Sequence, residues 1–120
     1  MKTDRELLEL AARAAGLHIK ADRVDADDRF THFVIGAKNT RERTNWNPLT
    51  DDGDALRLAV KLRITVGPES HDVIGRSLSR ASWNDRTMSL GEYGDGDPFK
   101  ATRRAIVRAA AEIQLQREKA

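Results

Sequence analysis

Three arginines near the C-terminus are the residues whose type and spacing best suit binding chemistry. Arg103, Arg104 and Arg108 fall in the stretch DPFKATRRAIVRAAAEI. A guanidinium stays charged at physiological pH and binds phosphate through two parallel hydrogen bonds. Arg104 and Arg108 are one helical turn apart, and Arg103 projects beside them. The cluster predicts an anion site near the start of a helix, although a solvated helix face has the same composition.

Two aromatic residues extend this hypothesis from an anion to a nucleotide. Trp83 and Tyr93 fall in or beside segments predicted as loops, where an aromatic ring can stack on a base. Aromatic residues are only 5% of the chain, so two of them in loops suggest a role in binding. The alternative interpretation is that each ring fills the edge of the core.

The acidic clusters have a structural explanation. Asp51, Asp52 and Asp54 precede or begin a predicted helix, and Asp95 and Asp97 precede another. Carboxylates in a first helical turn are favoured by the helix dipole, by about 0.3–1 kcal/mol each when exposed. The first cluster also lacks the ligand spacing of a calcium-binding EF-hand loop. We therefore expect these acids to cap helices rather than bind metal.

Other groups that could do chemistry are sparse. His18, His32 and His71 fall on different predicted elements, so a zinc site would need the fold to gather them. The chain has no cysteine, which excludes disulfides, thiolate zinc sites and a cysteine nucleophile. The serines lack the sequence context of a nucleophile elbow. We therefore expect a protein that is not an enzyme and has no metal site and no cofactor.

Composition limits the class of protein further. The 120 residues predict a single domain over 1–120, and 33% charged residues predict a well-solvated surface. The net charge is only +2, with no block of five like charges, so nucleic-acid binding is not expected. No apolar run approaches the ~18 residues that cross a bilayer, and the N-terminus MKTDRELLEL lacks the apolar core of a signal peptide. These features predict a cytoplasmic protein without membrane contact.

In the first half of the chain, periodicity and capping signals predict one helix and two strands. The capping box TDRE and an apolar repeat predict a helix over 4–15. Alternation predicts a strand over 17–21, and a β-branched and aromatic run predicts a second strand over 30–35, paired with it. A polar turn at 25–28 separates them, and residues 36–45 read as a loop.

The second half predicts two helices and three strands. Thr50 or Asp51 caps a helix whose buried face is Ala55, Leu56, Ala59 and Val60. Strands are predicted over 62–66, 72–78 and 87–93, with Gly67-Pro68 ending the first and a turn or loop over 79–86. Asp97 and Pro98 begin a last helix over 98–117, with Phe99 on its buried face.

These elements predict an α+β fold in the order α-β-β-α-β-β-β-α. A mostly antiparallel sheet of about four to five strands, packed with three helices, is the simplest way to bury the apolar faces.

Three segments of the chain resemble one family. TDRELLELAARAAG, WNPLTDDGDALRLAVKL and DPFKATRRAIVRAAAEI are similar to the phage ABA-sandwich domain, found in small phage and prophage proteins. The shared pattern is a short N-terminal helix, a W-N-P-x-x-D-D motif opening a central helix, and a terminal A-x-x-R-A-I-x-R-A-A helix. The resemblance covers about half of the chain and leaves out residues 67–94. Most members of that family have no established activity.

The size and layout are also similar to anti-Thoeris proteins of phages. Those proteins bind cyclic ADP-ribose-type signals, in some cases cyclic oligonucleotides, in pockets between subunits and without catalysis. The resemblance implies phosphate contacts from the helix arginines, stacking from an aromatic residue and one polar base contact. The implied residues are Arg103 and Arg104 for phosphate, Trp83 or Tyr93 for stacking, and Asn84 for the base.

Two functions are thus expected as alternatives. The first is a homo-oligomeric phage or prophage counter-defence protein that sequesters a cyclic nucleotide in the host cytoplasm. The second is a phage accessory protein that inhibits a host protein by direct contact, through a sheet edge or the loop over 36–45.

Overall fold

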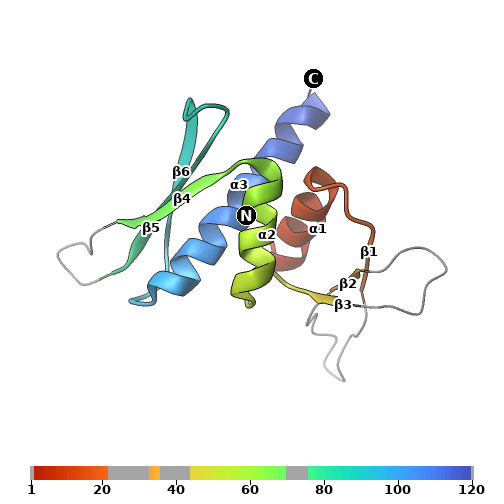
Figure 1. Ribbon diagram of the computed structural model, residues 1–120, viewed down its shortest axis with the longest axis horizontal. Coiled ribbons are helices and arrows are strands. Elements are labelled where there is room, and N and C mark those ends of the chain that lie inside the picture. Colours follow the sequence, from red (N-terminus) through yellow and green to blue (C-terminus); the bar gives the residue numbers. More distant parts are fainter. Residues whose placement is uncertain (1, 22–32, 36–43, 70–75, 120) are drawn as a thin grey trace.

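The computed structural model describes residues 2–21, 33–35, 44–69 and 76–119. Within them lie three helices and six strands, and the strands form two separate three-stranded antiparallel sheets (Figure 1). The predicted α+β class, the three helices and the antiparallel pairing are confirmed. The prediction of one sheet of four to five strands is wrong, because the segments before and after the central helix form separate sheets.

The elements follow one another along the chain with an additional strand before the central helix. Their bounds are α1 (Asp4–Ala14), β1 (Ile19–Ala21), β2 (Phe33–Ile35), β3 (Thr44–Trp46), α2 (Asp52–Leu62), β4 (Thr65–Glu69), β5 (Leu78–Trp83), β6 (Met88–Tyr93) and α3 (Pro98–Lys119).

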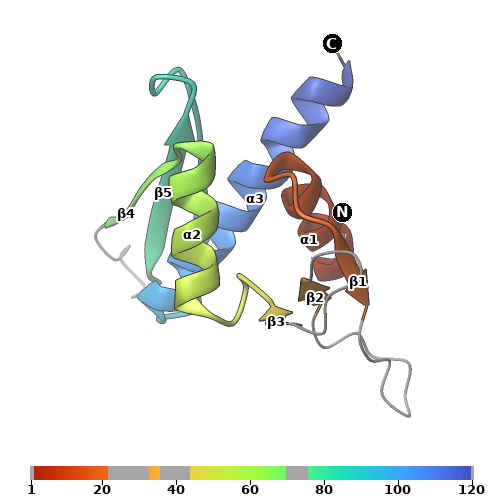
Figure 2. The same ribbon diagram turned by 45° about the vertical axis from the view of Figure 1, so that its right-hand side comes forward.

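Helix α3 is the element against which the other helices and the second sheet pack. It runs between α1 and α2 on one side and the β4–β5–β6 sheet on the other (Figures 1 and 2). Its buried positions are mostly alanine, and a methyl side chain lets a neighbouring backbone approach closely. The buried alanines of α3 are Ala101, Ala105, Ala109, Ala110 and Ala111.

Helix α1 begins and ends as its sequence predicts. The Thr3 hydroxyl accepts a hydrogen bond of 3.2 Å from the backbone N–H of Glu6, which makes Thr3 the N-cap. At the other end Gly16 has φ +71°, the left-handed conformation that favours glycine after a helix. Leu7, Leu8 and other apolar residues of α1 are buried in the core that α1 shares with α3.

The β4–β5–β6 sheet corrects two predictions. Strand β5 occupies Leu78–Trp83, and all of it after Leu78 falls in the segment 79–86, which is predicted as a turn or loop. The residues of β5 that face the core are Ser79, Ala81 and Trp83. Serine is polar and alanine is small, so the sequence lacks the alternation of large apolar residues that predicts a strand. Strand β4 also continues through Gly67 and Pro68, which an edge strand tolerates because Pro lacks only a donor.

The β1–β2–β3 sheet lies beside α1 and is built from three-residue strands. The predicted pairing of the first two strands is confirmed, with Ile19 opposite Ile35. Strand β3 extends into the predicted loop over 36–45, where Thr44 pairs with Ile35. The predicted turn at 25–28 and most of the loop lie outside the described residues, as does most of the predicted strand over 72–78.

The WNPLTDD motif is explained by the start of α2. The Asp51 carboxylate accepts the backbone N–H of Asp54 at 2.8 Å, so Asp51 is the N-cap. Asp54 is buried, and its carboxylate accepts both the N–H of Asn47 at 3.0 Å and the guanidinium of Arg57 at 2.8 Å. Trp46 is only 3% exposed, so its side chain is part of the core directly before the cap. The acids of this motif are therefore structural.

The buried face of α2 differs from the prediction. Ala55 and Ala59 are buried as expected, together with Leu58. Leu56 and Val60 were predicted to share that face, but they are 62% and 69% exposed. The helix has two neighbouring apolar stripes, and the described part of the chain covers only one.

The turn between β5 and β6 carries backbone strain. Asp85 and Arg86 have φ of 54° and 68°, and the N–H of Thr87 donates to the carbonyl of Asn84 at 3.1 Å. Asn84 also has a positive φ of 55°, so three consecutive residues of this turn adopt the left-handed conformation that glycine adopts most readily.

We predict that Arg86→Gly raises the free energy of unfolding by about 0.5–1 kcal/mol. Replacing a non-glycine residue in the left-handed conformation by glycine removes a steric cost of ~1–2 kcal/mol. Glycine loses more backbone entropy on folding, which lowers the free energy of unfolding by ~0.5–1 kcal/mol. Chemical denaturation measures the change. Ser89→Gly, in the extended part of the same hairpin, is the control and should lower stability; a loss of stability in Arg86→Gly would contradict the strain argument.

Candidate functional site

Arg103 is held by two groups at the start of α2. Its Nε–H donates to the carbonyl of Leu49 at 2.9 Å, and its Nη1 lies 2.7 Å from a carboxylate oxygen of Asp52. The side chain is only 17% exposed. The guanidinium therefore links α3 to α2, and its charge is neutralised where it lies.

Arg104 and Arg108 are held on another side of α3, by the same carboxylate. Arg104 Nε lies 3.3 Å from Glu92 Oε1, and its Nη1 lies 3.4 Å from a carboxylate oxygen of Asp4. Arg108 donates to the second oxygen of Glu92. The Glu92 side chain is 15% exposed, so the cluster joins β6, α3 and α1 in a half-buried position.

Arg103 and Arg104 therefore do not lie on a fully solvated helix face. The side chains are 17% and 27% exposed and both contact carboxylates. A further arginine of the same helix follows the pattern, since Arg117 donates to the carbonyl of Ala14 at the end of α1 at 2.9 Å. The basic residues of α3 bind its neighbours in the fold.

The predicted aromatic and polar contacts do not gather around these arginines. Trp83 is not in a loop; it is the last residue of β5 and is 6% exposed within the core, which corrects the expectation of a free stacking ring. Asn84 is exposed in the adjoining turn. Tyr93 lies at the opposite end of the hairpin, where its ring is 44% exposed and 4.5 Å from the guanidinium carbon of Arg76.

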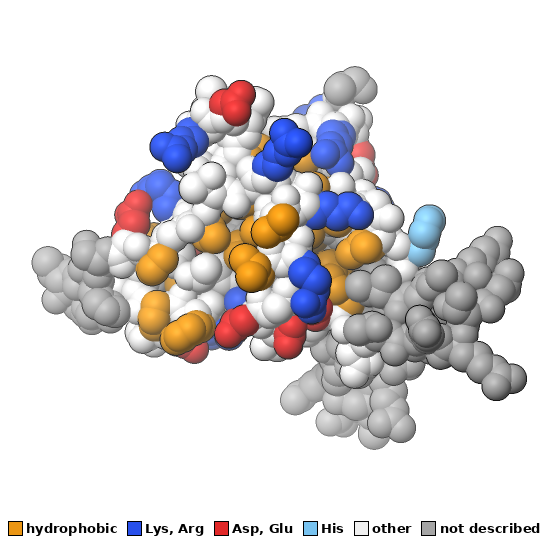
Figure 3. Space-filling model, in the orientation of Figure 1, with side chains coloured by type: hydrophobic (Ala, Val, Ile, Leu, Met, Phe, Trp, Pro, Cys, Tyr) orange, Lys and Arg blue, Asp and Glu red, His pale blue; other side chains and the backbone are white. Residues whose placement is uncertain are grey.

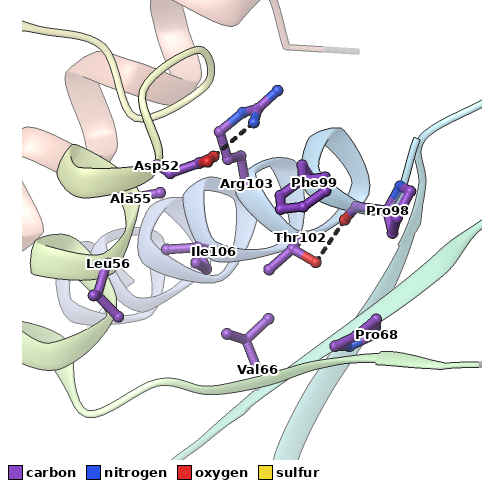
Figure 4. Close-up of a pocket in the computed structure, with 10 residues that line it drawn as sticks. All are labelled: Asp52, Ala55, Leu56, Val66, Pro68, Pro98, Phe99, Thr102, Arg103 and Ile106. Atoms are coloured by element: carbon purple, nitrogen blue, oxygen red, sulfur yellow. Dashed lines mark hydrogen bonds and ion pairs between the residues drawn. The ribbon is translucent and has the colours of Figure 1, made fainter.

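A groove near Arg103 is a concave site lined by described residues of three elements (Figure 4). It has a volume of about 470 Å³ and opens between α2, β4 and the first turns of α3. Seven of its ten lining residues are apolar. The lining consists of Asp52, Ala55, Leu56, Val66, Pro68, Pro98, Phe99, Thr102, Arg103 and Ile106.

The shape of the groove follows from the chain path. Helix α2 ends at Leu62, and its C-cap residue, Arg63, has a left-handed φ of 56° that turns the chain toward β4. The helix and the strand diverge from that point, and α3 crosses the wedge between them (Figures 1 and 4). Ile106 and Ala55 are buried at the base, whereas Leu56 and Phe99 are more than 60% exposed at the rim.

The polar groups of the groove already have partners within the protein. Asp52 and Arg103 contact each other, and the Thr102 hydroxyl donates to the carbonyl of Pro98 at 2.7 Å and lies 2.6 Å from the hydroxyl of Ser79. A ligand in this groove would therefore meet mainly apolar surface.

The sequence interpretation missed most of this groove. Phe99 was expected on the buried face of the last helix, but it is 65% exposed. Val66 and Pro68 belong to a strand that was expected to end at Gly67-Pro68. One sequence feature could have indicated the groove. The apolar residues of α2, which include Leu56 and Val60 beside Ala55 and Ala59, cover more of the helix surface than one buried face needs.

The described residues contain no group of three or more His, Cys, Asp or Glu side chains that could hold a metal ion. None of the described helices combines the length and apolar character needed to cross a bilayer. On the face drawn in Figure 3, hydrophobic side chains gather over α2 and beside it toward the β4–β5–β6 sheet. Comparison with known protein families, curated proteins and solved structures found no match to this chain.

We predict that Arg103→Ala lowers the free energy of unfolding by about 1.5–3 kcal/mol. That range is typical of hydrogen bonds to charged groups, and the substitution leaves the buried carbonyl of Leu49 without its donor. Urea denaturation measures the change.

Glu112→Ala, at an exposed position of the same helix, is the control and should change stability by less than about 0.5 kcal/mol. If Arg103→Ala were as stable as the control, the arginine would be a surface residue available to an anion.

Proposed function

We propose that this protein is a non-catalytic binding protein that docks an apolar segment of another protein in the groove between α2, β4 and α3. The observation that carries the proposal is the character of the groove. Its exposed rim is formed by Leu56 and Phe99, and its polar side chains are paired within the fold. Burial of apolar surface would supply the affinity, at roughly 25 cal/mol per Å² before the costs of association.

The charges of the site favour a protein over an anionic ligand. A phosphate that approached Arg103 would compete with the Asp52 carboxylate and the Leu49 carbonyl, both within hydrogen-bonding distance. Arg104 and Arg108 share Glu92 and do not line the groove. Removing one partner of a half-buried ion pair leaves the other charge uncompensated, which opposes such an exchange.

The size of the groove suits one or two large apolar side chains. Its volume of about 470 Å³ is within the range of ~300–1,000 Å³ common for ligand sites. A wedge between a helix and a strand resembles the grooves that accept one apolar face of an amphipathic helix. This supports the second of the two expected functions, a phage accessory protein acting on a host protein by contact. The contact surface would be the groove rather than a sheet edge or the loop over 36–45.

We predict that Phe99→Ser abolishes capture of the partner from a host lysate by immobilised protein, because it removes the most exposed ring of the rim. Phe99 is 65% exposed, so folding should be unchanged. Quantitative mass spectrometry of captured proteins measures the loss.

Met88→Ser is the matched control, because Met88 is an exposed apolar residue in the β5–β6 hairpin, outside the groove. Proteins retained by the wild type and by Met88→Ser but lost by Phe99→Ser are candidates for the partner. Identical captured sets from all three proteins would count against the groove.

Sequestration of a cyclic nucleotide is the second candidate function. The observation in its favour is that an arginine, an exposed aromatic ring and a hydroxyl, those of Arg103, Phe99 and Thr102, line one hollow. In that arrangement Phe99 replaces Trp83 as the stacking residue, since Trp83 is buried. The proposal requires the ligand to displace Asp52 from Arg103.

If the second candidate is correct, cyclic ADP-ribose isomers or cyclic di- and trinucleotides should raise the melting temperature of the wild-type protein but not of Phe99→Ser. A ligand bound at 100 times its dissociation constant stabilises the folded state by about 2.7 kcal/mol, which a thermal-shift assay resolves. Recovery of intact ligand after denaturation would exclude catalysis. No shift with any of these ligands would leave protein docking as the supported function.

A further inference from the structure

We propose that the outer face of α2 is a self-association surface, on which α2 of a second copy packs antiparallel about a two-fold axis. This inference concerns the stripe of Leu56 and Val60 and the charges at the two ends of the helix. It goes beyond docking of a partner in the groove, because Val60 does not line the groove.

The first observation is an apolar stripe that the described chain leaves open. Leu56 and Val60 are one helical turn apart and are 62% and 69% exposed. They are two of the large hydrophobic residues exposed on the described surface, and they lie on one short helix of 11 residues. Residues four apart form a ridge along a helix surface, and such ridges pack against the surface of a facing helix.

The second observation identifies the partner, because the ends of α2 carry opposite charges. Asp51 and Asp52 begin the helix with carboxylates that are 59% and 65% exposed; each also lies within 4.0 Å of an arginine of its own chain, Asp51 at 3.9 Å from Arg57 and Asp52 at 2.7 Å from Arg103. Lys61 and Arg63 end it, and within the described part of the chain neither contacts a carboxylate. In Figure 3, acidic side chains and a basic one lie at the lower edge of the hydrophobic patch, and basic side chains lie above it.

A second copy related by a two-fold axis presents the same apolar stripe and the same charged helix ends in the opposite direction. Antiparallel packing brings Leu56 of each copy against Val60 of the other, and it sets the acidic end of one helix beside the basic end of the other. When Leu56 is level with the partner's Val60, the partner's Lys61 is level with Ala55, about 4.5 Å along the helix from Asp52, at 1.5 Å per residue. The antiparallel arrangement also sets the two helix dipoles in their favourable orientation.

The size of the contact predicts its strength. A contact centred on two 11-residue helices falls below the ~1,200 Å² of total buried surface that stable interfaces reach. The self-association should therefore be a reversible monomer–dimer equilibrium rather than a permanent dimer. Opposite charges at both ends should make it sensitive to salt.

Sedimentation velocity of the full chain, over a dilution series from millimolar to micromolar, tests the proposal. The wild type should shift from dimer to monomer on dilution. Val60→Asp should raise the dissociation constant by at least about 100-fold, because it places two carboxylates in an apolar contact. Lys61→Glu should raise it by about fivefold, whereas Lys119→Glu, the same charge change at the end of α3, should have no effect.

Circular dichroism measures the helical content of each variant. If Val60→Asp loses helix, Val60→Ser is used in its place. A wild type that stays monomeric at every concentration would overturn the proposal, as would a Val60→Asp protein that dimerises normally. Phe99→Ser should dimerise like the wild type, and Val60→Asp should still capture the groove partner. Failure of self-association and failure of groove docking are thereby separated.

Discussion

Close packing around the alanine-rich face of α3 is the constraint on which the rest of the structure depends. Ala101, Ala105 and Ala109 are fully buried, and their small side chains let α1, α2 and the β4–β5–β6 sheet approach one helix from different sides. A larger residue at any of these positions would push a neighbour away, because protein interiors tolerate added volume poorly. The wedge between α2 and β4 exists because α3 occupies the space beneath both elements (Figure 4).

The arginines of α3 follow from that central position. A helix surrounded by other elements can place a guanidinium against each of them, and Arg103, Arg104 and Arg117 contact α2, α1 with β6, and the end of α1. Each charge is met by a carboxylate or a carbonyl, so the residues that had suggested anion binding hold the fold together. The exposed apolar surfaces are therefore better suited to binding than these paired arginines are.

Those surfaces meet at Leu56, which lines the groove and also belongs to the exposed stripe of α2. One helix would thus serve two contacts, a partner's apolar segment on the side facing β4 and a second copy on its outer face. Exposed leucine, valine and phenylalanine side chains cost little when scattered, but gathered on one face they favour protein contact. Both proposals therefore rest on the same excess of apolar residues over what the described chain buries.

The sequence by itself determined the local structure: the caps at Thr3 and Asp51, the helix over 98–117 and the α+β class, because capping and periodicity are set by near neighbours. It did not determine which side of α2 is buried, since Ala55 and Leu56 are both apolar and only α3 selects between them. It also could not show that Arg103 meets Asp52, 51 residues away in the chain. Residues distant in sequence are brought together only by tertiary packing. The charge of the arginines could therefore be read from the sequence, but the carboxylates that neutralise it could not.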